Sequence, residues 1–301
     1  MPTITVASFN CENLFTRFRF SANLKQSTID NAVKNGFILD RKLFETIIEK
    51  ERDLTAKAIK DTKADILGLQ EVENLDTLKS FQSRFLKSYQ YQYLIDGNDP
   101  RLIDVGVLSK IVAKHLVTHQ FDKSGKSKVF SRDCLEIEYN LNGTPFTLFV
   151  NHFKSMLGGR SQTMARRKAQ SQRVVQIVTD KFGSNPGNEN FIIVGDLNDY
   201  MPSSGLHPLL SQPWLENVVQ TRLPQSEQWT HWYDREKSVS QLDYILVSKR
   251  IADGNPNAKP LIVRKGLAQK ATQYAGPRYP GVGALRPSAS DHCPVGITIT
   301  I

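Results

Sequence analysis

Short runs of β-branched and aromatic residues recur along the chain and predict β-strands. Some of them, such as FIIVG at 191–195, are apolar throughout, which is typical of strands buried on both faces. The last run, PVGITITI, alternates strictly between apolar and other residues. The expected strands cover residues 3–9, 65–70, 91–95, 103–109, 134–140, 146–152, 191–195, 242–248 and 294–301.

Apolar residues at helical spacing predict three helices between these strands, at 41–62, 74–88 and 161–182. The third is basic and amphipathic. Residues 17–40 are polar and irregular, so we expect a long loop there. The chain shows no internal repeat, low-complexity tract or linker, and we therefore expect one domain over residues 1–301.

Polar residues of a catalytic type stand at the ends of the expected strands. Four of them follow strands (Asn10, Glu71, His152 and Asp196), and three precede strands (Asp243, Asp291 and His292). If all of them face one site, some strands run toward that site and others run away from it. This requires mixed or antiparallel sheets and argues against a TIM barrel or a doubly wound parallel sheet. Two packed sheets with helices outside would satisfy the pattern.

The stretch FIIVGDLNDY shows the pattern most clearly. A buried strand leads directly into Asp196, Asn198 and Asp199, three side chains of metal-ligand type, which suggests that they are aimed at one target. Taken alone, the stretch is equally compatible with a turn held by hydrogen bonds from its Asp and Asn side chains.

Taken together, the strand-end residues suit phosphoryl chemistry. Their oxygen ligands favour Mg²⁺ or Mn²⁺, with Ca²⁺ as an alternative, over zinc. His152 and His292 could polarise an oxygen or move a proton near neutral pH. Asp243 could fix the tautomer of one histidine. Carboxylates, a metal ion and two histidines are what in-line displacement at phosphorus requires.

The motifs SFNCENLF, LQEVEN, VNHFKS, VGDLND, QLDYILVS and SDHCPV occur in this order over residues 8–296. Together they resemble those of the endonuclease/exonuclease/phosphatase superfamily of metal-dependent phosphoesterases. The resemblance implies an α/β fold, a four-layer α/β/β/α sandwich of two packed mixed or antiparallel sheets flanked by helices. It places the site at one edge of the paired sheets, in agreement with the strand-end argument.

The resemblance also implies roles for the metal-side residues. Glu71 would be the principal metal ligand, with Asn10 bonding the phosphate or a metal-bound water. Asp196 would orient or deprotonate the attacking water, and Asn198 would contact the phosphate or the metal. Asp291 would be a carboxylate beside the metal, and Glu12 falls where some members have a second carboxylate.

Three further roles follow from the same resemblance. His152 would act on a phosphate or leaving oxygen, as in the deoxyribonuclease and sphingomyelinase branches, whereas the apurinic-endonuclease branch has tyrosine there. Asp243 would orient His292, the second catalytic histidine. The sequence leaves open which residue is the general base.

The net charge of +9 is distributed unevenly along the chain. The segments 139–179 and 254–290 contain no acidic residue and several basic ones. They indicate either a solvated basic surface or an anionic partner. In the first segment, Arg160 and Arg167 are candidate phosphate contacts. Trp229, Trp232 and Tyr233 could stack on bases or pack on the core.

These observations favour a nuclease or general phosphodiesterase, with DNA or RNA among the candidate substrates. The alternative is a phosphatase or diesterase for a small or lipid phosphoester. A non-catalytic scaffold is disfavoured because the expected ligands and histidines are all present. No obligate protein partner is evident.

The compartment is inferred from what the sequence lacks. Its three cysteines are widely spaced and form no zinc pattern, which suits a reducing compartment. We see no signal peptide and no transmembrane stretch, so we expect a cytoplasmic protein.

Overall fold

The fold is built on two six-stranded sheets. The computed structural model describes residues 2–16, 18–21, 24–34 and 44–301. The first sheet has the order β17 (Leu261–Ile262), β18 (Val295–Thr300), β1 (Thr3–Leu14), β4 (Ile66–Val72), β6 (Asp104–Ser109) and β5 (Tyr91–Leu94). The second has the order β13 (Leu215–Asn217), β16 (Asp243–Ser248), β12 (Phe191–Asp196), β11 (Thr144–His152), β10 (Cys134–Leu141) and β7 (Ala113–Val117).

The two sheets pack face to face, and their strands are buried on both sides. In β11, Leu148 and Val150 belong to the core between the sheets. Phe149 points the other way, into the core beneath the outer helices. Because successive side chains of a strand alternate between its faces, both faces of a covered strand must be apolar. This explains why FTLFV and FIIV read as continuous apolar runs.

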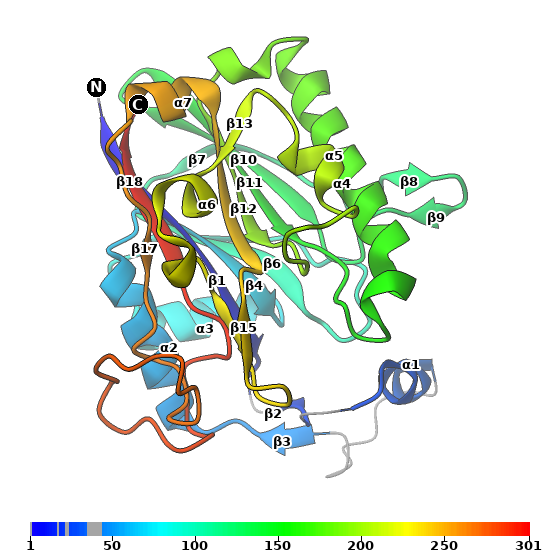
Figure 1. The fold of residues 1–301 in the computed structure, drawn as a ribbon, viewed down its shortest axis with the longest axis vertical. Helices are drawn as coiled ribbons and strands as arrows, with labels where there is room; N and C mark the ends of the chain where they lie inside the picture. The colour runs from blue at the N-terminus through cyan, green and yellow to red at the C-terminus, as the bar shows by residue number, and fades with distance from the viewer. Residues whose placement is uncertain (1, 17, 22–23, 35–43) are drawn as a thin grey trace.

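Helices cover the two outer faces (Figure 1). On the first sheet, α2 (Glu49–Thr62) and α3 (Leu75–Phe85) contribute residues such as Ile59 and Leu78 to an outer core. On the second sheet, α4 (Arg160–Phe182) packs Val174 and Ile177 against the strands. The expected four-layer α/β/β/α sandwich is confirmed.

Both sheets are mixed, as the strand-end argument requires. In the first, β1 runs parallel to β4 and antiparallel to β18. In the second, β12 runs parallel to β11 and antiparallel to β16. The pairing of β1 with β18 brings the two ends of the chain side by side, and Thr3 pairs with Thr300 (Figure 1).

Smaller elements complete the described chain. The short helices are α1 (Gln26–Lys34), α5 (His207–Leu210), α6 (Val218–Arg222), α7 (Lys249–Gly254), η1 (Pro186–Asn188) and η2 (Gln225–Glu227). Three two-stranded sheets pair β2 (Phe18–Phe20) with β3 (Phe44–Thr46), β8 (Lys123–Ser124) with β9 (Ser127–Lys128), and β14 (His231–Tyr233) with β15 (Ser238–Ser240). No helix within the described ranges combines the length and apolar character needed to cross a membrane.

Two expectations about the N-terminal region were wrong. The loop expected at 17–40 contains strand β2 and helix α1, and its residues 17, 22–23 and 35–40 lie outside the described ranges. The helix expected at 41–62 begins only at Glu49, because residues 44–46 form β3 instead; residues 41–43 lie outside the described ranges. A few apolar residues at helical spacing do not distinguish a helix from a short strand followed by a turn.

Candidate active site

The residues expected at strand ends gather at one edge of the sandwich. Asn10, Glu71, His152 and Asp196 lie at or near the carboxyl ends of β1, β4, β11 and β12, while Asp243 begins β16, and Asp291 and His292 lie just before β18. Hydrogen bonds and ion pairs connect these groups across the two sheets. The site therefore lies where the parallel strands end and their antiparallel neighbours begin.

A glycine immediately before Asp196 sets the path of the chain. Gly195 has a φ of +141°, and a Cβ at this position would lie 1.9 Å from the carbonyl oxygen of Asn151 on the neighbouring strand. Only glycine fits such a close approach with this backbone conformation. The β12 strand can thus remain paired to β11 while it delivers Asp196 to the edge.

Four other residues at this edge adopt positive φ angles although they carry side chains. They are Glu12 (48°), Asn13 (63°), Glu71 (62°) and Asn198 (51°). Such conformations cost free energy and are retained where the surrounding structure holds them, commonly at functional sites. At β4, the pairing with β1 and β6 is irregular on either side of Glu71, so its side chain leaves the regular alternation of the sheet.

Asp196 is the centre of the hydrogen-bond network. Its Oδ2 accepts bonds from the Nδ2 of Asn10 and the Nδ2 of Asn198, each at 3.0 Å. Its Oδ1 accepts the backbone N–H of Asn198 at 2.8 Å. The Nδ2 of Asn198 also donates to the carbonyl oxygen of Phe153, so both asparagines fix the orientation of this carboxylate.

The pKa of Asp196 is raised to about 7. Burial is the main cause, and the nearby carboxylate of Asp243 adds to it. The positive charge of His292 and the hydrogen bonds from Asn10 and Asn198 act in the opposite direction. A carboxyl group whose pKa lies near neutrality is suited to exchange a proton with water at physiological pH.

Glu71 lies beside this network and is held by the N-terminal strand. Its Oε1 accepts from the Nδ2 of Asn10 at 3.4 Å, and its Oε2 accepts the backbone N–H of Asn13 at 3.0 Å. One fifth of the Glu71 side chain is exposed, whereas that of Asp196 is buried. Glu71 is therefore the carboxylate of this pair that opens toward solvent.

His152 is buried between the two carboxylates and the basic residues behind it. Its Nε2 lies 3.6 Å from the Oδ2 of Asp196 and 4.0 Å from the Oε1 of Glu71. Burial, followed by the charges of Arg132 and Arg101, holds the pKa of His152 well below its usual value. This imidazole is therefore neutral at physiological pH.

His292 has the opposite electrostatic environment. Its Nδ1 lies 2.8 Å from the Oδ2 of Asp243, which also accepts from the hydroxyl of Thr230 at 2.7 Å. Burial lowers the pKa of His292, but the negative charges of Asp243 and Asp196 outweigh it and hold the pKa well above its usual value. The site therefore has one neutral histidine and one protonated histidine, with Asp196 between them.

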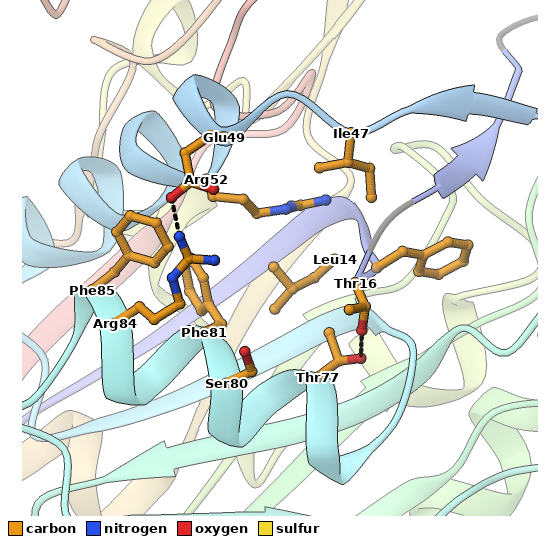
Figure 2. Close-up of a pocket in the computed structure, with 11 residues that line it drawn as sticks. Leu14, Thr16, Ile47, Glu49, Arg52, Thr77, Ser80, Phe81, Arg84 and Phe85 are labelled. Carbon is orange, nitrogen blue, oxygen red and sulfur yellow. Dashed lines mark hydrogen bonds and ion pairs between the residues drawn. The ribbon is translucent and has the colours of Figure 1, made fainter.

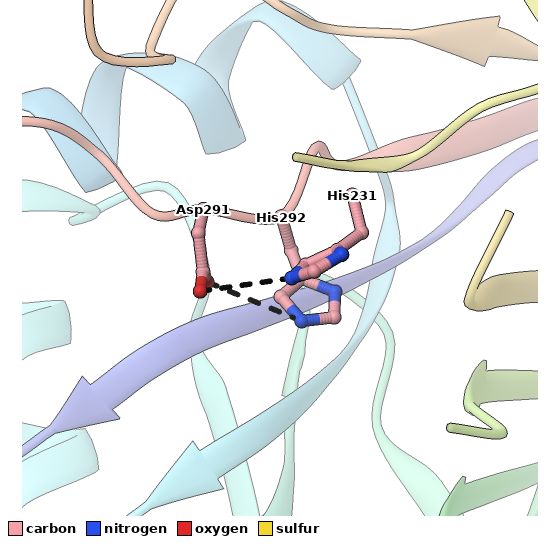
Figure 3. A group of neighbouring side chains, drawn as sticks. All are labelled: His231, Asp291 and His292. Atoms are coloured by element: carbon pink, nitrogen blue, oxygen red, sulfur yellow. Dashed lines mark ion pairs between the residues drawn. The ribbon is translucent and has the colours of Figure 1, made fainter. Parts of the chain in front are cut away.

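His231 joins this group and was not singled out from the sequence. Its ring lies 4.6 Å from that of His292, centroid to centroid, and its Nε2 lies 3.7 Å from the Oδ2 of Asp291 (Figure 3). This contact and the charge of His292 outweigh the effect of desolvation and keep the pKa of Asp291, whose side chain is 40 % exposed, below its usual value. The stretch EQWTHWYD gave only an aromatic signal, and the position of its histidine depends on the pairing of β14 with the segment before β18.

Glu12 is held within the site by backbone and side-chain contacts. Its Oε2 accepts the backbone N–H of Asp291 at 3.0 Å, and its Oε1 forms an ion pair with Arg286. Arg286 comes from the long acid-free segment at 254–290 and attaches that segment to the end of β1. Glu12 thus connects the first strand to the segment that carries His292.

Arg160 and Arg167 do not face this cluster. Both guanidinium groups pair with Asp199, at 2.6 Å and 3.0 Å, and the Arg167 side chain is completely buried. Asp199 therefore points away from Asp196 and Asn198 and attaches its loop to α4. Arg167 therefore has a structural role and is not part of the site. Arg160 also stabilises the loop, because it donates hydrogen bonds to the carbonyl oxygens of Tyr200 and Pro202.

The three aromatic residues expected near the site also differ from one another. Trp232 is buried and packs in a small core with Leu267. Trp229 is covered by the guanidinium of Arg264, 4.2 Å from the ring centre. Tyr233 is the exposed member, at 39 %. The packing interpretation thus applies to both tryptophans.

The carboxylate oxygens of Glu71 and Asp196 fit a hard divalent cation, whereas Asn10 turns its Nδ2 toward both of them and its Oδ1 accepts the backbone N–H of Glu12. Both carboxylates converge on the same amide group of Asn10. Burial raises the pKa of Asp196 because it disfavours the charged carboxylate, and a bound cation would offset this cost. Carboxylate and amide oxygens are the ligands that Mg²⁺ and Mn²⁺ prefer. A second grouping, Asp196, Asp243 and His292, also has one possible ligand atom per residue within 4.8 Å of the others.

A cavity of about 90 Å³ lies apart from these groups (Figure 2). It is bordered by Leu14 and Thr16 at the end of β1 and by residues of α2 and α3. Arg84 pairs with Glu49 across one side, and the hydroxyls of Thr16 and Thr77 meet at the other, 2.7 Å apart. None of the strand-end polar residues lines this cavity.

Comparisons with known proteins agree with this architecture. The sequence profile of the Endonuclease/Exonuclease/phosphatase family matches residues 5–300. Similar solved structures include truncated TDP2 from Caenorhabditis elegans (16% identity, TM-score 0.63, 99% of this chain and 98% of that one) and SmcL (17%, 0.63, 99% of both chains). The human Nocturnin catalytic domain with bound sulfate anion is 18% identical, with a TM-score of 0.61, covering 99% of this chain and 94% of that one. A search of curated proteins found no match.

Proposed function

We propose that this chain, which belongs to the endonuclease/exonuclease/phosphatase family, hydrolyses phosphodiester bonds at the site described above. The reaction is an in-line attack of a water molecule on phosphorus. Members of the family are metal-dependent phosphoester hydrolases. The observation that carries the proposal is the placement of Asp196 between a neutral histidine, His152, and a protonated one, His292. A base for water and a proton donor for an oxygen are both available within one site.

The carboxylate of Asp196 accepts a proton from the attacking water or orients that water. Its pKa of about 7 in the metal-free chain leaves both protonation states accessible near neutrality. Asn10 and Asn198 hold it in a fixed orientation, so that it needs no rearrangement before reaction.

The two histidines act on the oxygens of the phosphoryl group. His292 presents its Nε2 while Asp243 holds its Nδ1, so it can donate a proton to the leaving oxygen. His152 is neutral, and its Nε2 faces the same space, where it can hydrogen-bond a phosphoryl oxygen. The human Nocturnin catalytic domain, which is similar in fold, was solved with a bound sulfate, a tetrahedral anion as a phosphate group is.

A divalent cation fits this arrangement beside Glu71. Glu71 and Asp196 would hold it through carboxylate oxygens, and Asn10 would do so through its Oδ1 after its amide group turns. Bound there, Mg²⁺ or Mn²⁺ would neutralise negative charge that develops on the phosphoryl oxygens.

One structural feature favours a compact phosphoester as an alternative substrate to nucleic acid. Six arginines of the acid-free basic segments are engaged with partners inside the protein: Arg160, Arg167, Arg173, Arg264, Arg278 and Arg286. They contribute less to an exposed anion-binding surface than the sequence suggested. Arg166 and Lys168 of α4 are exposed and remain candidates for contacts with a polyanion.

The experiment is a comparison of two substrates, bis(p-nitrophenyl) phosphate and supercoiled plasmid, with Mg²⁺ or Mn²⁺ at low and moderate salt. We expect hydrolysis of the small diester, with Asp196→Ala and His292→Ala each reducing turnover at least about 10³-fold. His207→Ala, which removes an exposed histidine on α5, is the matched control. Near-normal turnover in either site variant would refute the proposal.

The salt response then separates the two substrate classes. Plasmid nicking that falls steeply with salt would identify a nuclease, because each phosphate contact releases counterions. Hydrolysis of the small diester alone would identify a compact phosphoester as the substrate.

A further inference from the structure

A cluster of three side chains lies beside the proposed catalytic groups: His231, Asp291 and His292. The proposed reaction uses His292 but gives no role to His231. The three side chains offer one ligand atom each, and these three atoms lie within 4.8 Å of one another. In Figure 3 both imidazoles lie on the same side of Asp291, whose Oδ2 is 3.7 Å from the Nε2 of His231 and whose Oδ1 is 4.0 Å from the Nε2 of His292.

These separations are close to those of a metal centre. With metal–ligand bonds of about 2.1 Å at tetrahedral angles, ligand atoms lie about 3.4 Å apart. Small rotations of the side chains would therefore bring all three atoms into a coordination sphere. Two imidazoles and one carboxylate leave the fourth position open, a ligand set typical of zinc.

The backbone fixes this arrangement independently of any ion. Residues 231 and 292 face each other in an antiparallel bridge, with the N–H of Trp232 bonded to the carbonyl of Asp291 at 3.0 Å and the N–H of Cys293 bonded to that of Thr230 at 2.7 Å. Asp243 occupies the Nδ1 of His292 and leaves its Nε2 for another partner. A carboxylate behind a histidine is the usual support of a metal-binding imidazole.

We propose that His231, Asp291 and His292 form a binding site for a transition-metal cation such as Zn²⁺, distinct in ligand type from the oxygen-lined site at Glu71. Imidazole nitrogens favour Zn²⁺ strongly over Mg²⁺, whereas the carboxylate and amide donors around Glu71 favour Mg²⁺. The chain thus separates two kinds of cation by ligand chemistry within one edge of the sandwich.

Occupation of this site has a consequence for catalysis that rests on the proposed function. An ion on the Nε2 of His292 displaces the proton from this atom to solvent, and that proton is the one His292 would donate to the leaving oxygen. Zinc therefore inhibits hydrolysis supported by Mg²⁺, although binding of zinc itself does not depend on the reaction.

The first test measures zinc binding without substrate, by competition with a chromophoric zinc chelator. We expect the wild-type protein to take up Zn²⁺ and His231→Gln to bind it roughly tenfold or more weakly, since even loss of a supporting carboxylate costs that much. His231→Glu has the same shape as the Gln variant but keeps an anionic ligand, so it should retain part of the affinity. His115→Gln, an exposed histidine on β7, is the control and should bind as the wild type does.

Two results would overturn the proposal: no zinc uptake by the wild-type protein, or equal affinity in the wild-type and His231→Gln proteins. The Gln and Glu variants have the same shape, so a difference between them isolates the ligand from any common effect on folding. Circular dichroism and urea unfolding of each variant verify that the compared proteins are folded.

The second test measures the rate of diester hydrolysis in saturating Mg²⁺ while Zn²⁺ is added. Each variant is compared with its own zinc-free rate. We expect His231→Gln to require roughly tenfold or more zinc for half-inhibition. If zinc binds as expected but the chain hydrolyses no phosphoester, the proposed function fails and the metal site stands.

Discussion

The buried carboxylate of Asp196 should destabilise the metal-free protein at neutral and alkaline pH. Its pKa rises from 3.8 to about 7 on folding, so the folded state holds the proton more tightly than the unfolded state does. Stability is therefore lost as pH rises from the unfolded value toward the folded one. Over the whole interval the loss amounts to roughly 4 kcal/mol, since each unit of pKa change corresponds to about 1.4 kcal/mol.

The substitution Asp196→Asn removes this titration. Its amide cannot accept all three hydrogen bonds that the carboxylate accepts, and lost bonds of this kind cost roughly 1–3 kcal/mol at any pH. The pH dependence isolates the charge from that constant cost. Between pH 5 and pH 8 the titration of Asp196 lowers the stability of the wild-type protein by roughly 3 kcal/mol, so the variant should gain this amount relative to wild type.

The assay is urea unfolding in EDTA at several pH values, with free energies obtained by linear extrapolation. Asp53→Asn, which removes a surface carboxylate paired with Lys57 on α2, is the control for the chemistry of the substitution. A free-energy difference between Asp196→Asn and wild type that is constant from pH 5 to pH 8 would refute the reasoning. Added Mg²⁺ should reduce the wild-type loss, because a bound cation stabilises the ionised carboxylate.

Two further predictions concern the supports of the site. Gly195→Ala should destabilise the fold by about 3 kcal/mol or more, because the new Cβ meets the Asn151 carbonyl on the paired strand; an unchanged urea midpoint would contradict this. Arg167→Met should lower the free energy of unfolding by about 3–5 kcal/mol, because it leaves the buried Asp199 without one of its two arginines. Arg166→Ala should leave stability unchanged, and it should reduce the salt dependence of binding only for a polyanionic substrate. Urea unfolding and salt titrations of KM distinguish the two arginines.

The strand-end pattern was the most informative part of the sequence. Three residues could be placed at one edge of the sheets: Asn10, Glu71 and Asp196. The apolar runs show where each strand ends, and the direction of the strand determines which edge that end reaches. That argument predicted mixed sheets, which the structure confirms. The roles of these residues in catalysis remain predictions.

The contacts of long side chains could not be predicted in the same way. Arg167 was expected to bind phosphate because it lies in a basic helix, yet it is buried against Asp199, which follows Asp196 and Asn198 in the same loop. Sequence periodicity does not show which loop packs over which helix face. His231 was missed for a related reason, since its position depends on pairing between segments about sixty residues apart.

The distribution of the strand-end residues along the chain has a consequence for how the site could be assembled. The loop around η1 separates Asn10, Glu71 and His152 from Asp196 and the later residues, so two fragments divided there would each carry an incomplete set. Neither fragment has its full sheet partners, because β1 needs β18 and β11 needs β12. The complete set of strand-end residues would therefore exist only where the two fragments pair with each other. In the intact chain, the same long-range pairing raises the contact order and favours slow folding.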